Sequence, residues 1–280
     1  MQILDGKALS EKLIDSVKGK AAKLKPKLAV IMVGEDPASL VYVRNKKRAC
    51  ERAGIEYEEL KFPTSITQDK LLKEIDKLNK DDSVNGFIVQ IPLPEHIYLP
   101  EVIKAIDPQK DVDGFHAYNI GKMFLGPEFE DLPPATPFGV VKLLDYYDIP
   151  IQGKEVVVVG RSNIAGKPIS VMMLNRDATV TTCHRLTKDL AFHTRRADIL
   201  IVAVGKPNLI TADMVKEGVV VVDIGTNKKE DGKLCGDVDY PNVSKKASYI
   251  TPVPGGVGPM TVAALILNTV RATERQKLNL

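Results

Sequence analysis

The sequence predicts an α/β protein of two domains, and three observations lead to this class. The 280 residues exceed one ordinary α/β domain and fit two domains of about 100–150 residues each. Short β-rich runs alternate with helical segments almost throughout, which is typical of parallel sheets covered by helices. Hydrophobic residues make up 44% of the chain and charged residues 27%, so two sizeable cores can be buried.

In the first half, short β-rich runs predict three strands, over Lys27–Val33, Tyr57–Phe62 and Gly86–Ile91. Helices are predicted before and between them, over Leu9–Leu24, Pro37–Ala53 and Gln68–Asn79. The second helix has clear ends, because Asp36 suits the N-cap, Pro37 the first helical position and Gly54 the stop.

Four strand candidates follow in the second half, and most are rich in Val and Ile, as expected for strands buried on both faces. They are Glu155–Gly160, Ala178–Cys183, Asp198–Val204 and Val219–Ile224. We expect a helix over Pro137–Tyr147 to bridge the halves and a last helix over Pro259–Thr273 to pack back on either domain. Between the halves, residues 92–137 contain several prolines and glycines and predict a long functional loop.

Composition excludes several classes of function. A net charge of +3 gives no indication of a nucleic-acid partner, and no block of like charge suggests a binding tail. Cys50, Cys183 and Cys235 are far apart without CxxC spacing, which argues against a disulfide framework or a zinc site and favours a reducing cytoplasm. No apolar run approaches the length of a membrane span, and the first residues have no apolar signal core.

A strand ending at Gly160, followed by Arg161 to Gly166, predicts a dinucleotide-binding turn. Its spacing is G-x-S-x-x-x-G rather than the more familiar G-x-G-x-x-G. Gly160 permits a tight turn, Gly166 permits close approach, and Pro168 fits the first turn of the next helix. Free N–H groups at that helix start would attract a pyrophosphate. Glycine turns are common in α/β proteins, and it is the position in the first βα unit of the series that favours a dinucleotide.

Two arginines favour NADP over NAD. An NAD site usually carries an acid about 20 residues beyond the turn, whereas the next strand here ends in Thr182-Cys-His-Arg185. We expect Arg161 and Arg185 near the place of a 2′-phosphate, which suits the fork of donors on arginine. The alternative is that both arginines are solvated surface residues.

Tyr42 and Lys46 are four residues apart in the predicted helix Pro37–Ala53 and therefore share a face. On spacing alone, Lys46 is one of many solvated lysines. A lysine that is partly shielded beside carboxylate and amide groups can act in proton transfer. Desolvation lowers the pKa of such a lysine, and a neighbouring carboxylate opposes that shift. A functional role for Lys46 therefore requires such partners.

Six motifs stand in a fixed order along the chain. They are Tyr42-Val-Arg-Asn-Lys46, Val89-Gln-Ile-Pro-Leu-Pro94, Lys110-Asp-Val-Asp-Gly-Phe115, Thr136-Pro-Phe-Gly139, Gly160-Arg-Ser162 with Gly166 and Pro168, and Pro252-Val-Pro-Gly-Gly-Val-Gly-Pro-Met-Thr261. Together they resemble the bifunctional methylenetetrahydrofolate dehydrogenase/cyclohydrolase family. The resemblance covers essentially the whole chain, and residues 110–114 and 251–261 are its most specific parts.

The resemblance implies two α/β domains flanking a cleft, the second a Rossmann-type dinucleotide-binding domain. Residues 1–140, completed by the C-terminal helix 259–280, would form the folate-binding catalytic domain, and residues 141–258 the dinucleotide domain. The protein would oxidise 5,10-methylenetetrahydrofolate to 5,10-methenyltetrahydrofolate with NADP, or less favourably NAD, and hydrolyse the product to 10-formyltetrahydrofolate. It would be a cytoplasmic homodimer that requires no metal.

Site residues follow from the same motifs. Lys46 would be the key residue of the cyclohydrolase step, Gln90 its hydrogen-bond partner, Tyr42 a stacking partner of the folate, and Asp113 the ligand of its pterin ring. A neutral Lys46 would act as a base, whereas a charged one would disfavour the methenyl cation. The other predicted folate contacts are Pro252, Gly255, Gly256 and Pro259. The predicted dinucleotide contacts are Gly160, Arg161, Ser162, Gly166, Pro168, Arg185 and Thr226. Many family members have serine at the position of Arg185.

Three other functions stay open at this point. They are a related two-domain dehydrogenase acting on shikimate or an amino acid, a non-catalytic dinucleotide-sensing or folate-binding module, and a protein with only one of the two activities. The motif at Gln90 and the loop 252–259 favour folate, and the joint presence of Lys46, Gln90 and Asp113 argues against a non-catalytic module. The strand Ala178–Cys183 is also a candidate for an interface between copies.

Overall fold

The computed structural model describes residues 1–229 and 231–278, which form two compact units. Unit 1 consists of residues 1–10 and 136–261, and unit 2 of residues 11–135 and those from 262 onward. The predicted functional domains, 1–140 with 259–280 and 141–258, stay a prediction. The compact units differ from them in placing residues 1–10 with residues 136–261.

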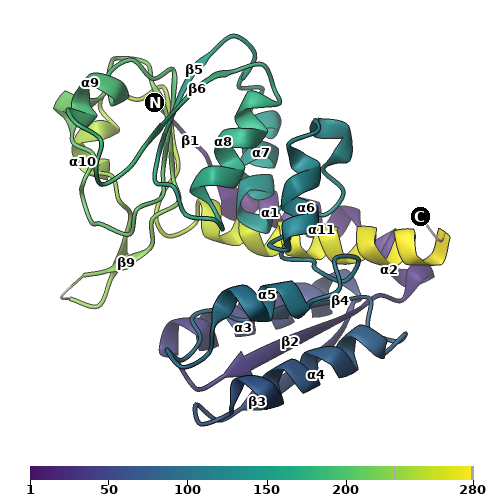
Figure 1. Cartoon of the computed structure of the whole chain (residues 1–280). Coiled ribbons are helices and arrows are strands. Elements are labelled where there is room, and N and C mark those ends of the chain that lie inside the picture. The colour runs from purple at the N-terminus through teal and green to yellow at the C-terminus, as the bar shows by residue number, and fades with distance from the viewer. Residues whose placement is uncertain (230, 279–280) are drawn as a thin grey trace. The chain divides into compact units, whose positions relative to one another are not determined.

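Unit 2 is built on a parallel three-stranded sheet in the order β3-β2-β4. Its strands are Glu56–Phe62 (β3), Lys27–Val33 (β2) and Gly86–Val89 (β4). The central strand β2 is buried along almost its whole length, as its run of apolar residues requires. Figure 1 shows α3 (Pro37–Ala53) and α4 (Gln68–Lys80) on opposite sides of β2, so both faces of the sheet are covered.

The ends of α3 confirm the prediction from its capping residues. The Asp36 carboxylate accepts the N–H of Ser39, Pro37 opens the helix, and Gly54 adopts φ +75° at its end. The single helix predicted over Leu9–Leu24 is wrong, because it is two helices, α1 (Gly6–Ser16) and α2 (Lys18–Leu24). The N–H of Val17 reaches back only three residues, to Ile14, and so interrupts the helical ladder.

The long loop predicted over residues 92–137 is wrong in part, since the segment contains several short helices. They are α5 (Leu99–Ala105), α6 (Ala117–Met123), the 3₁₀ turn η1 (Pro127–Phe129) and the start of α7 (Ala135–Tyr146). Prolines stand in the first turns of α5 and η1, where a missing N–H costs nothing. In this segment a high proline content therefore indicates the starts of helices as well as loops.

Unit 1 contains a six-stranded parallel sheet in the order β1-β11-β8-β7-β5-β6. Its strands are Gln2–Ile3 (β1), Tyr249–Ile250 (β11), Val220–Asp223 (β8), Ile199–Val202 (β7), Glu155–Val159 (β5) and Thr179–Cys183 (β6). The four strands predicted for the second half are confirmed with slightly shorter ends. The two-residue strands β1 and β11 are too short to leave a pattern in the sequence.

The strand order of unit 1 reverses at β5, which pairs with β6 on one side and with β7 on the other. Ligands of open α/β sheets bind beyond the carboxyl ends of the strands at such a reversal. The remaining elements of the unit are α8 (Gly166–Leu174), α9 (Leu190–Thr194), the 3₁₀ turn η2 (Ala212–Met214), the antiparallel pair β9 (Asn227–Lys228) and β10 (Leu234–Cys235), and α10 (Tyr240–Val243).

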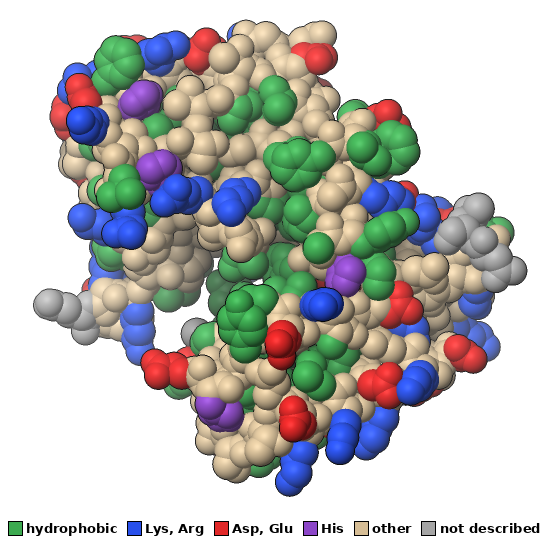
Figure 2. Space-filling model, viewed as in Figure 1, with side chains coloured by type: hydrophobic (Ala, Val, Ile, Leu, Met, Phe, Trp, Pro, Cys, Tyr) green, Lys and Arg blue, Asp and Glu red, His purple; other side chains and the backbone are tan. Residues whose placement is uncertain are grey.

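The last helix, α11 (Val257–Leu278), is longer at both ends than the predicted Pro259–Thr273. On the face shown in Figure 2, Lys and Arg side chains are interspersed with Asp and Glu, for example over α4. Among the helices of residues 1–229 and 231–278, none is long and apolar enough to cross a membrane.

Candidate functional site

A buried lysine and a glutamine form the centre of the candidate site in unit 2. Lys46 lies on α3 with only 7% of its surface exposed, and its Nζ donates a hydrogen bond to Gln90 Oε1 at 2.9 Å. Gln90 follows β4 directly, and its Nε2 donates to the carbonyl of Ile91 at 2.7 Å. That second bond fixes the orientation of the amide, so its oxygen faces the lysine.

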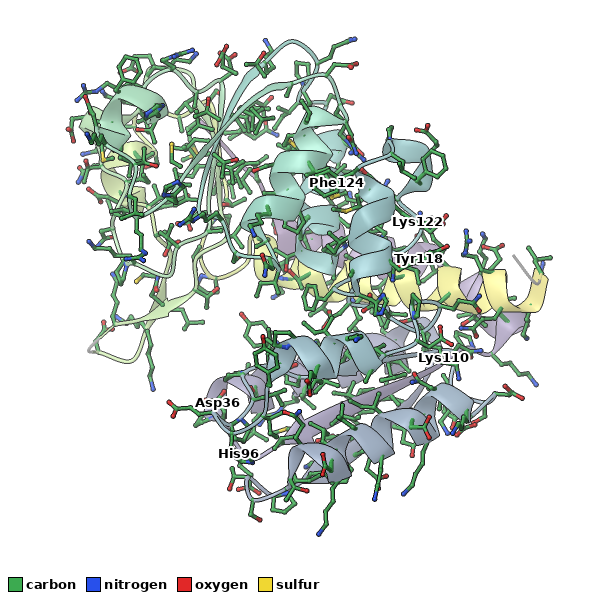
Figure 3. The ribbon with its side chains drawn as sticks, viewed as in Figure 1. Asp36, His96, Lys110, Tyr118, Lys122 and Phe124 are labelled. Carbon is green, nitrogen blue, oxygen red and sulfur yellow. The ribbon has the colours of Figure 1, made fainter. Side chains whose placement is uncertain are left out.

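The topology of the unit 2 sheet explains why these two side chains meet. Strands β2 and β4 are parallel neighbours, so both end at the same edge of the sheet. Figure 3 shows Asp36, which opens α3 after β2, and His96, which follows β4, at this edge. Helix α3 starts there and carries Lys46 on its buried face, within reach of Gln90.

Burial controls the charge of the lysine. Desolvation lowers the pKa of Lys46, and the nearby carboxylate of Asp113 opposes that shift. In turn, desolvation raises the pKa of Asp113 while the lysine opposes it. One helical turn beyond Lys46, burial also raises the pKa of the Cys50 thiol to about 12, so this thiol is not a nucleophile. Lys46 is therefore a buried amine with a lowered pKa, held by an amide, and such an amine suits proton transfer.

Asp111 builds the turn that carries Asp113. Its buried carboxylate accepts the N–H groups of residues 114, 115 and 116 and the side-chain amide of Asn119, at 2.8–3.3 Å. Four donors on one carboxylate hold this turn rigid, and the partly exposed Asp113 lies inside it. The sequence motif around Asp111 does not by itself indicate this role.

Two further polar residues hold the same segment. Asn268 on α11 is fully buried and donates to the carbonyls of Val112 and Pro133 at 2.9 and 2.8 Å. Lys110, labelled in Figure 3, donates to two carbonyls at the end of α4. In the sequence, Asn268 stands out as a polar residue inside the apolar run of the last helix. Its hydrogen-bond partners could not be predicted, because they lie more than 130 positions away along the chain.

The Asp111→Ala substitution should destabilise the protein by about 3 kcal/mol, because it leaves buried donors without an acceptor. Urea unfolding would measure this loss. Ala at the exposed Asp82 is the control and should change the free energy of unfolding by less than about 0.5 kcal/mol. A variant at Asp111 as stable as the unmodified protein would contradict the assigned role of this carboxylate.

In unit 1, the predicted dinucleotide turn has the geometry that its glycines indicate. Gly160 adopts φ +124°, and a Cβ added there would lie 2.2 Å from the carbonyl oxygen of Ala203. A Cβ added at Gly166 would lie 2.2 Å from the carbonyl oxygen of Gly160. The turn therefore has no side chain at either glycine, and it lies at the reversal between β5 and β7. A backbone without side chains at this place suits the close approach of a dinucleotide phosphate.

The expectation of free N–H groups at the start of α8 is wrong for residues 165–167. The Ser162 hydroxyl accepts the N–H groups of Ala165 and Gly166 at 3.2 and 3.3 Å, and the Ser162 carbonyl accepts that of Lys167 at 3.0 Å. Pro168 has no N–H to offer. Ser162 thus acts as an internal cap, and these amides are not available to a phosphate while it holds them.

The exposed candidates for cofactor binding follow strand ends of the unit 1 sheet. Arg161 follows β5, Arg185 stands two residues after β6, and Thr226 follows β8. The N–H of Gly160 donates to the carbonyl of Cys183 at 2.9 Å, which ties the ends of β5 and β6 together. Both arginines therefore start from the edge that carries the glycine turn.

The loop predicted to line the folate site is held inside unit 1. Gly255 adopts φ +106°, and its carbonyl accepts the N–H of Lys7 at 2.8 Å. A Cβ added at Gly6 would lie 1.9 Å from the carbonyl oxygen of Gly256. Pro252 opens this loop with its side chain partly exposed, and Pro259 is the third residue of α11. Gly256 serves close packing, since a Cβ added there would lie 2.6 Å from the carbonyl oxygen of Pro252, and Gly255 serves the positive φ.

The structure thus gathers Lys46, Gln90, Asp113 and, one turn before Lys46 on α3, Tyr42 in unit 2. The glycine turn and the loop 252–259 lie in unit 1. Unit 1 has a Rossmann-type sheet with a glycine turn, which is typical of a dinucleotide-dependent enzyme. Unit 2 adds a shielded lysine, which is typical of a proton-transfer centre. The class of protein is therefore a dinucleotide-dependent enzyme with a separate proton-transfer centre.

The chain belongs to the tetrahydrofolate dehydrogenase/cyclohydrolase family. The family model of the catalytic domain matches residues 4–113, and that of the NAD(P)-binding domain matches residues 134–277. The chain is 55% identical over 279 residues to the bifunctional protein FolD of Nautilia profundicola, with 98% of each chain covered. The family predicted from the sequence motifs is confirmed.

Solved structures agree with this assignment. A bifunctional FolD methylenetetrahydrofolate dehydrogenase/cyclohydrolase from Campylobacter jejuni superposes with a TM-score of 0.96 at 52% identity, covering 99% of both chains. The Trypanosoma brucei enzyme, solved with NADP and an inhibitor, gives a TM-score of 0.93 at 35% identity over 98% of this chain and 97% of that one. A shikimate dehydrogenase from Peptoclostridium difficile covers 90% of this chain and 91% of that one, with a TM-score of 0.54 at 15% identity, and shares the fold alone.

Proposed function

We propose that this chain oxidises 5,10-methylenetetrahydrofolate with NADP and hydrolyses the resulting methenyl group to 10-formyltetrahydrofolate. The observation that carries the second step is the shielded Lys46–Gln90 pair, since it provides a buried amine whose pKa is lowered by desolvation and which a glutamine amide holds in place. The family of the chain supplies the substrate class. The separate glycine turn of unit 1 accounts for the first step.

In the hydrolysis, Lys46 is the base. The methenyl carbon is cationic, so a charged lysine beside it would repel the substrate, whereas a neutral one takes a proton from the attacking water as its oxygen bonds to that carbon. The bond from this carbon to N5 then breaks while N5 receives the proton from Lys46, which leaves the formyl group on N10 and the lysine neutral again. Gln90 Oε1 accepts one N–H of the amine and thereby directs its lone pair away from the glutamine. Burial lowers the pKa of Lys46, a shift toward the neutral form that this step uses.

Tyr42 and Asp113 orient the folate in this proposal. Tyr42 is partly exposed one helical turn before Lys46 and offers a ring for stacking. Asp113 accepts the adjacent N–H donors of the aminopyrimidine edge, and the turn built by Asp111 holds it in place. Pro252, Gly255, Gly256 and Pro259 line the same substrate in our proposal.

The dehydrogenase step uses the turn from Gly160 to Gly166. NADP supplies the hydride acceptor when it is bound, and the protein positions it. Gly160, Ser162, Gly166 and Pro168 shape the turn, Arg161 and Arg185 bind the 2′-phosphate, and Thr226 adds a hydroxyl after β8. The absence of side chains at the two glycines supports the assignment of this turn to the dinucleotide.

The chain is proposed to work as a cytoplasmic homodimer without nucleic-acid or membrane partners. In unit 1, β6 stands last in the strand order and pairs with β5 alone among the described strands. An edge of this kind can pair with its copy across a twofold axis. Light scattering of the purified chain would measure its mass in solution.

One assay tests the proposed function directly. Purified protein receives methylenetetrahydrofolate with NADP or with NAD, and both methenyl absorbance and reduced cofactor are followed. Reduced NADP and subsequent loss of methenyl absorbance are expected. No reduced cofactor with either dinucleotide would contradict the dehydrogenase, and a persistent methenyl signal would contradict the cyclohydrolase.

Arg185→Ser should weaken NADP binding about tenfold and leave NAD binding nearly unchanged, because it removes a charge-assisted contact to the 2′-phosphate. Isothermal titration with each dinucleotide measures the difference. Ser at Arg176, which follows α8 and is partly exposed, is the basic-residue control and should bind both dinucleotides like the unmodified protein. An equal effect of Arg185→Ser on NADP and NAD would contradict contact with the 2′-phosphate.

Gln90→Glu should move the pH dependence of hydrolysis. A carboxylate 2.9 Å from the amine raises the pKa of Lys46, which burial otherwise lowers, so the neutral base appears only at higher pH. The rate at neutral pH should fall and the rising limb of the pH profile should shift upward. Initial rates from pH 6 to 10, corrected for uncatalysed hydrolysis, measure this shift. If the rising limb of the pH profile does not shift, the group that controls the rate is not Lys46.

A further inference from the structure

Two buried aspartates stand near the carboxyl edge of the unit 1 sheet without a role in the proposed chemistry. Asp223 ends β8 and is 3% exposed, and Asp237 follows β10 and is fully buried. Burial raises the pKa of Asp223 to about 6, and the negative charge of Asp237 adds to this shift, whereas the backbone N–H groups that Asp223 accepts oppose it. Burying two neighbouring carboxylates is unfavourable in itself, so the pair requires a reason beyond stability.

Asp237 holds a surface loop from inside the protein. Its Oδ2 accepts the N–H groups of Val204 and Gly205 at 2.7 and 3.0 Å, and its Oδ1 accepts the N–H of Lys206 at 2.8 Å. Asn227 donates to the same Oδ1 at 2.8 Å. Residues 204–206 are exposed, yet three consecutive N–H groups turn inward onto one carboxylate.

Asp223 in turn fixes Asp237. Its Oδ1 accepts the N–H groups of Gly225 and Asp237 at 2.9 and 3.0 Å, and its Oδ2 accepts that of Val238 at 2.9 Å. Each aspartate packs on a glycine of the other segment. A Cβ at Gly225 would lie 2.2 Å from Asp237 Cγ, and one at Gly236 would lie 1.8 Å from Asp223 Oδ2. The two segments therefore interlock.

The loop held by Asp237 borders the dinucleotide turn. It follows β7, and its preceding residue, Ala203, has the carbonyl against which Gly160 packs. The N–H of Ala203 donates to the carbonyl of Val159, the last residue of β5, at 2.8 Å. Residues 203–206 thus form one wall of the reversal point between β5 and β7, where a dinucleotide binds in sheets of this kind.

We propose that Asp237, held by Asp223, is a positioning residue for the dehydrogenase step, presetting residues 203–206 beside Gly160 for the dinucleotide. It acts through the backbone and does not touch the cofactor. A loop ordered before binding avoids the entropy cost of ordering on binding, which strengthens affinity. This inference rests on the proposed NADP-dependent function.

Hydrogen exchange of the unmodified protein without cofactor tests whether residues 203–206 are ordered before the dinucleotide binds, and it requires no variant. The amides of residues 204–206 should be protected although the loop is exposed, whereas that of the exposed Asp231, in the segment between β9 and β10, should exchange faster. Equal exchange of the two segments would overturn the proposal.

Asp237→Asn tests the link to the cofactor, because an amide nitrogen replaces one acceptor and leaves one or two loop N–H groups without a partner. We expect the dissociation constant for NADP to rise at least about tenfold, with loss of protection at residues 204–206. Hydrolysis of methenyltetrahydrofolate, measured without NADP, should stay unchanged because its base, Lys46, and the partner of that base, Gln90, lie in unit 2.

Asn227→Ala is the matched control, since Asn227 binds the same carboxylate but lies outside the loop. It should bind NADP within about twofold of the unmodified protein. A folded Asp237→Asn protein with unchanged NADP affinity would overturn the proposal, as would an equal weakening by Asn227→Ala. Failure of the proposed function is distinguishable, because the unmodified protein would then not bind NADP at all.

Discussion

Lys46→Met should lower the rate of methenyltetrahydrofolate hydrolysis about 100- to 10,000-fold, the usual contribution of a positioned acid–base group. The methionine side chain is unbranched, only one atom shorter than that of lysine, and suits the buried position, so the fold should survive. Stopped-flow absorbance of the methenyl group gives the rate. The dissociation constant for NADP serves as the check on folding, because the dinucleotide turn belongs to unit 1.

Lys46→Arg separates a base from a mere positive charge. Arginine keeps the charge but stays protonated across the accessible pH range, so it cannot accept the proton of water. Hydrolysis by this variant should be as slow as that of Lys46→Met. A Lys46→Arg protein that hydrolyses its substrate at the normal rate would mean that charge, rather than proton acceptance, is what the site requires.

The sequence could predict the parts of this fold that depend on neighbouring residues. The strand Lys27–Val33 and the helix Pro37–Ala53 have in the structure the bounds that their apolar run and capping residues indicate. The short helices between residues 92 and 137 were missed, because their prolines suggest a loop as readily as a helix start. The strands β1 and β11 were missed because two residues have no periodicity.

The candidate site likewise has features that the sequence predicts and features that only the structure shows. Lys46, Gln90 and Asp113 were found through motifs, yet only the structure gives the hydrogen bond of the first two and the burial that shifts the pKa of Lys46. Asp111 stands in the same motif as Asp113, but nothing local distinguishes a carboxylate that builds a turn from one that faces a ligand. Long-range partners decide such roles, and a single sequence does not show them.

The glycine turn of unit 1 shows how a correct motif can rest on a partly wrong reason. Its glycines are required by close backbone packing, as expected, but Ser162 already occupies N–H groups that a phosphate was expected to use. The turn is therefore stabilised internally before any ligand binds. Its most sensitive point should be the contact between its two ends, Gly160 and Gly166.

Gly166→Ala should abolish most dehydrogenase activity. The new Cβ would lie 2.2 Å from the carbonyl oxygen of Gly160 and 2.5 Å from its carbon, and both are backbone atoms that cannot rotate away. The turn must open, and a displacement of about 1 Å at a positioned group costs about 100-fold in rate. The strain should also lower the free energy of unfolding by about 1–3 kcal/mol. Reduction of NADP and urea unfolding measure the two effects.

The control is Gly19→Ala on α2, where an added Cβ meets no atom within 4 Å. It should bind and reduce NADP normally and stabilise the helix by roughly 0.5 kcal/mol, because alanine loses less backbone entropy than glycine. Gly166→Ala should still hydrolyse methenyltetrahydrofolate, since Lys46 and Gln90 lie in the other unit. Normal NADP reduction by Gly166→Ala would show that the turn tolerates the added carbon and that the dinucleotide does not depend on its closure.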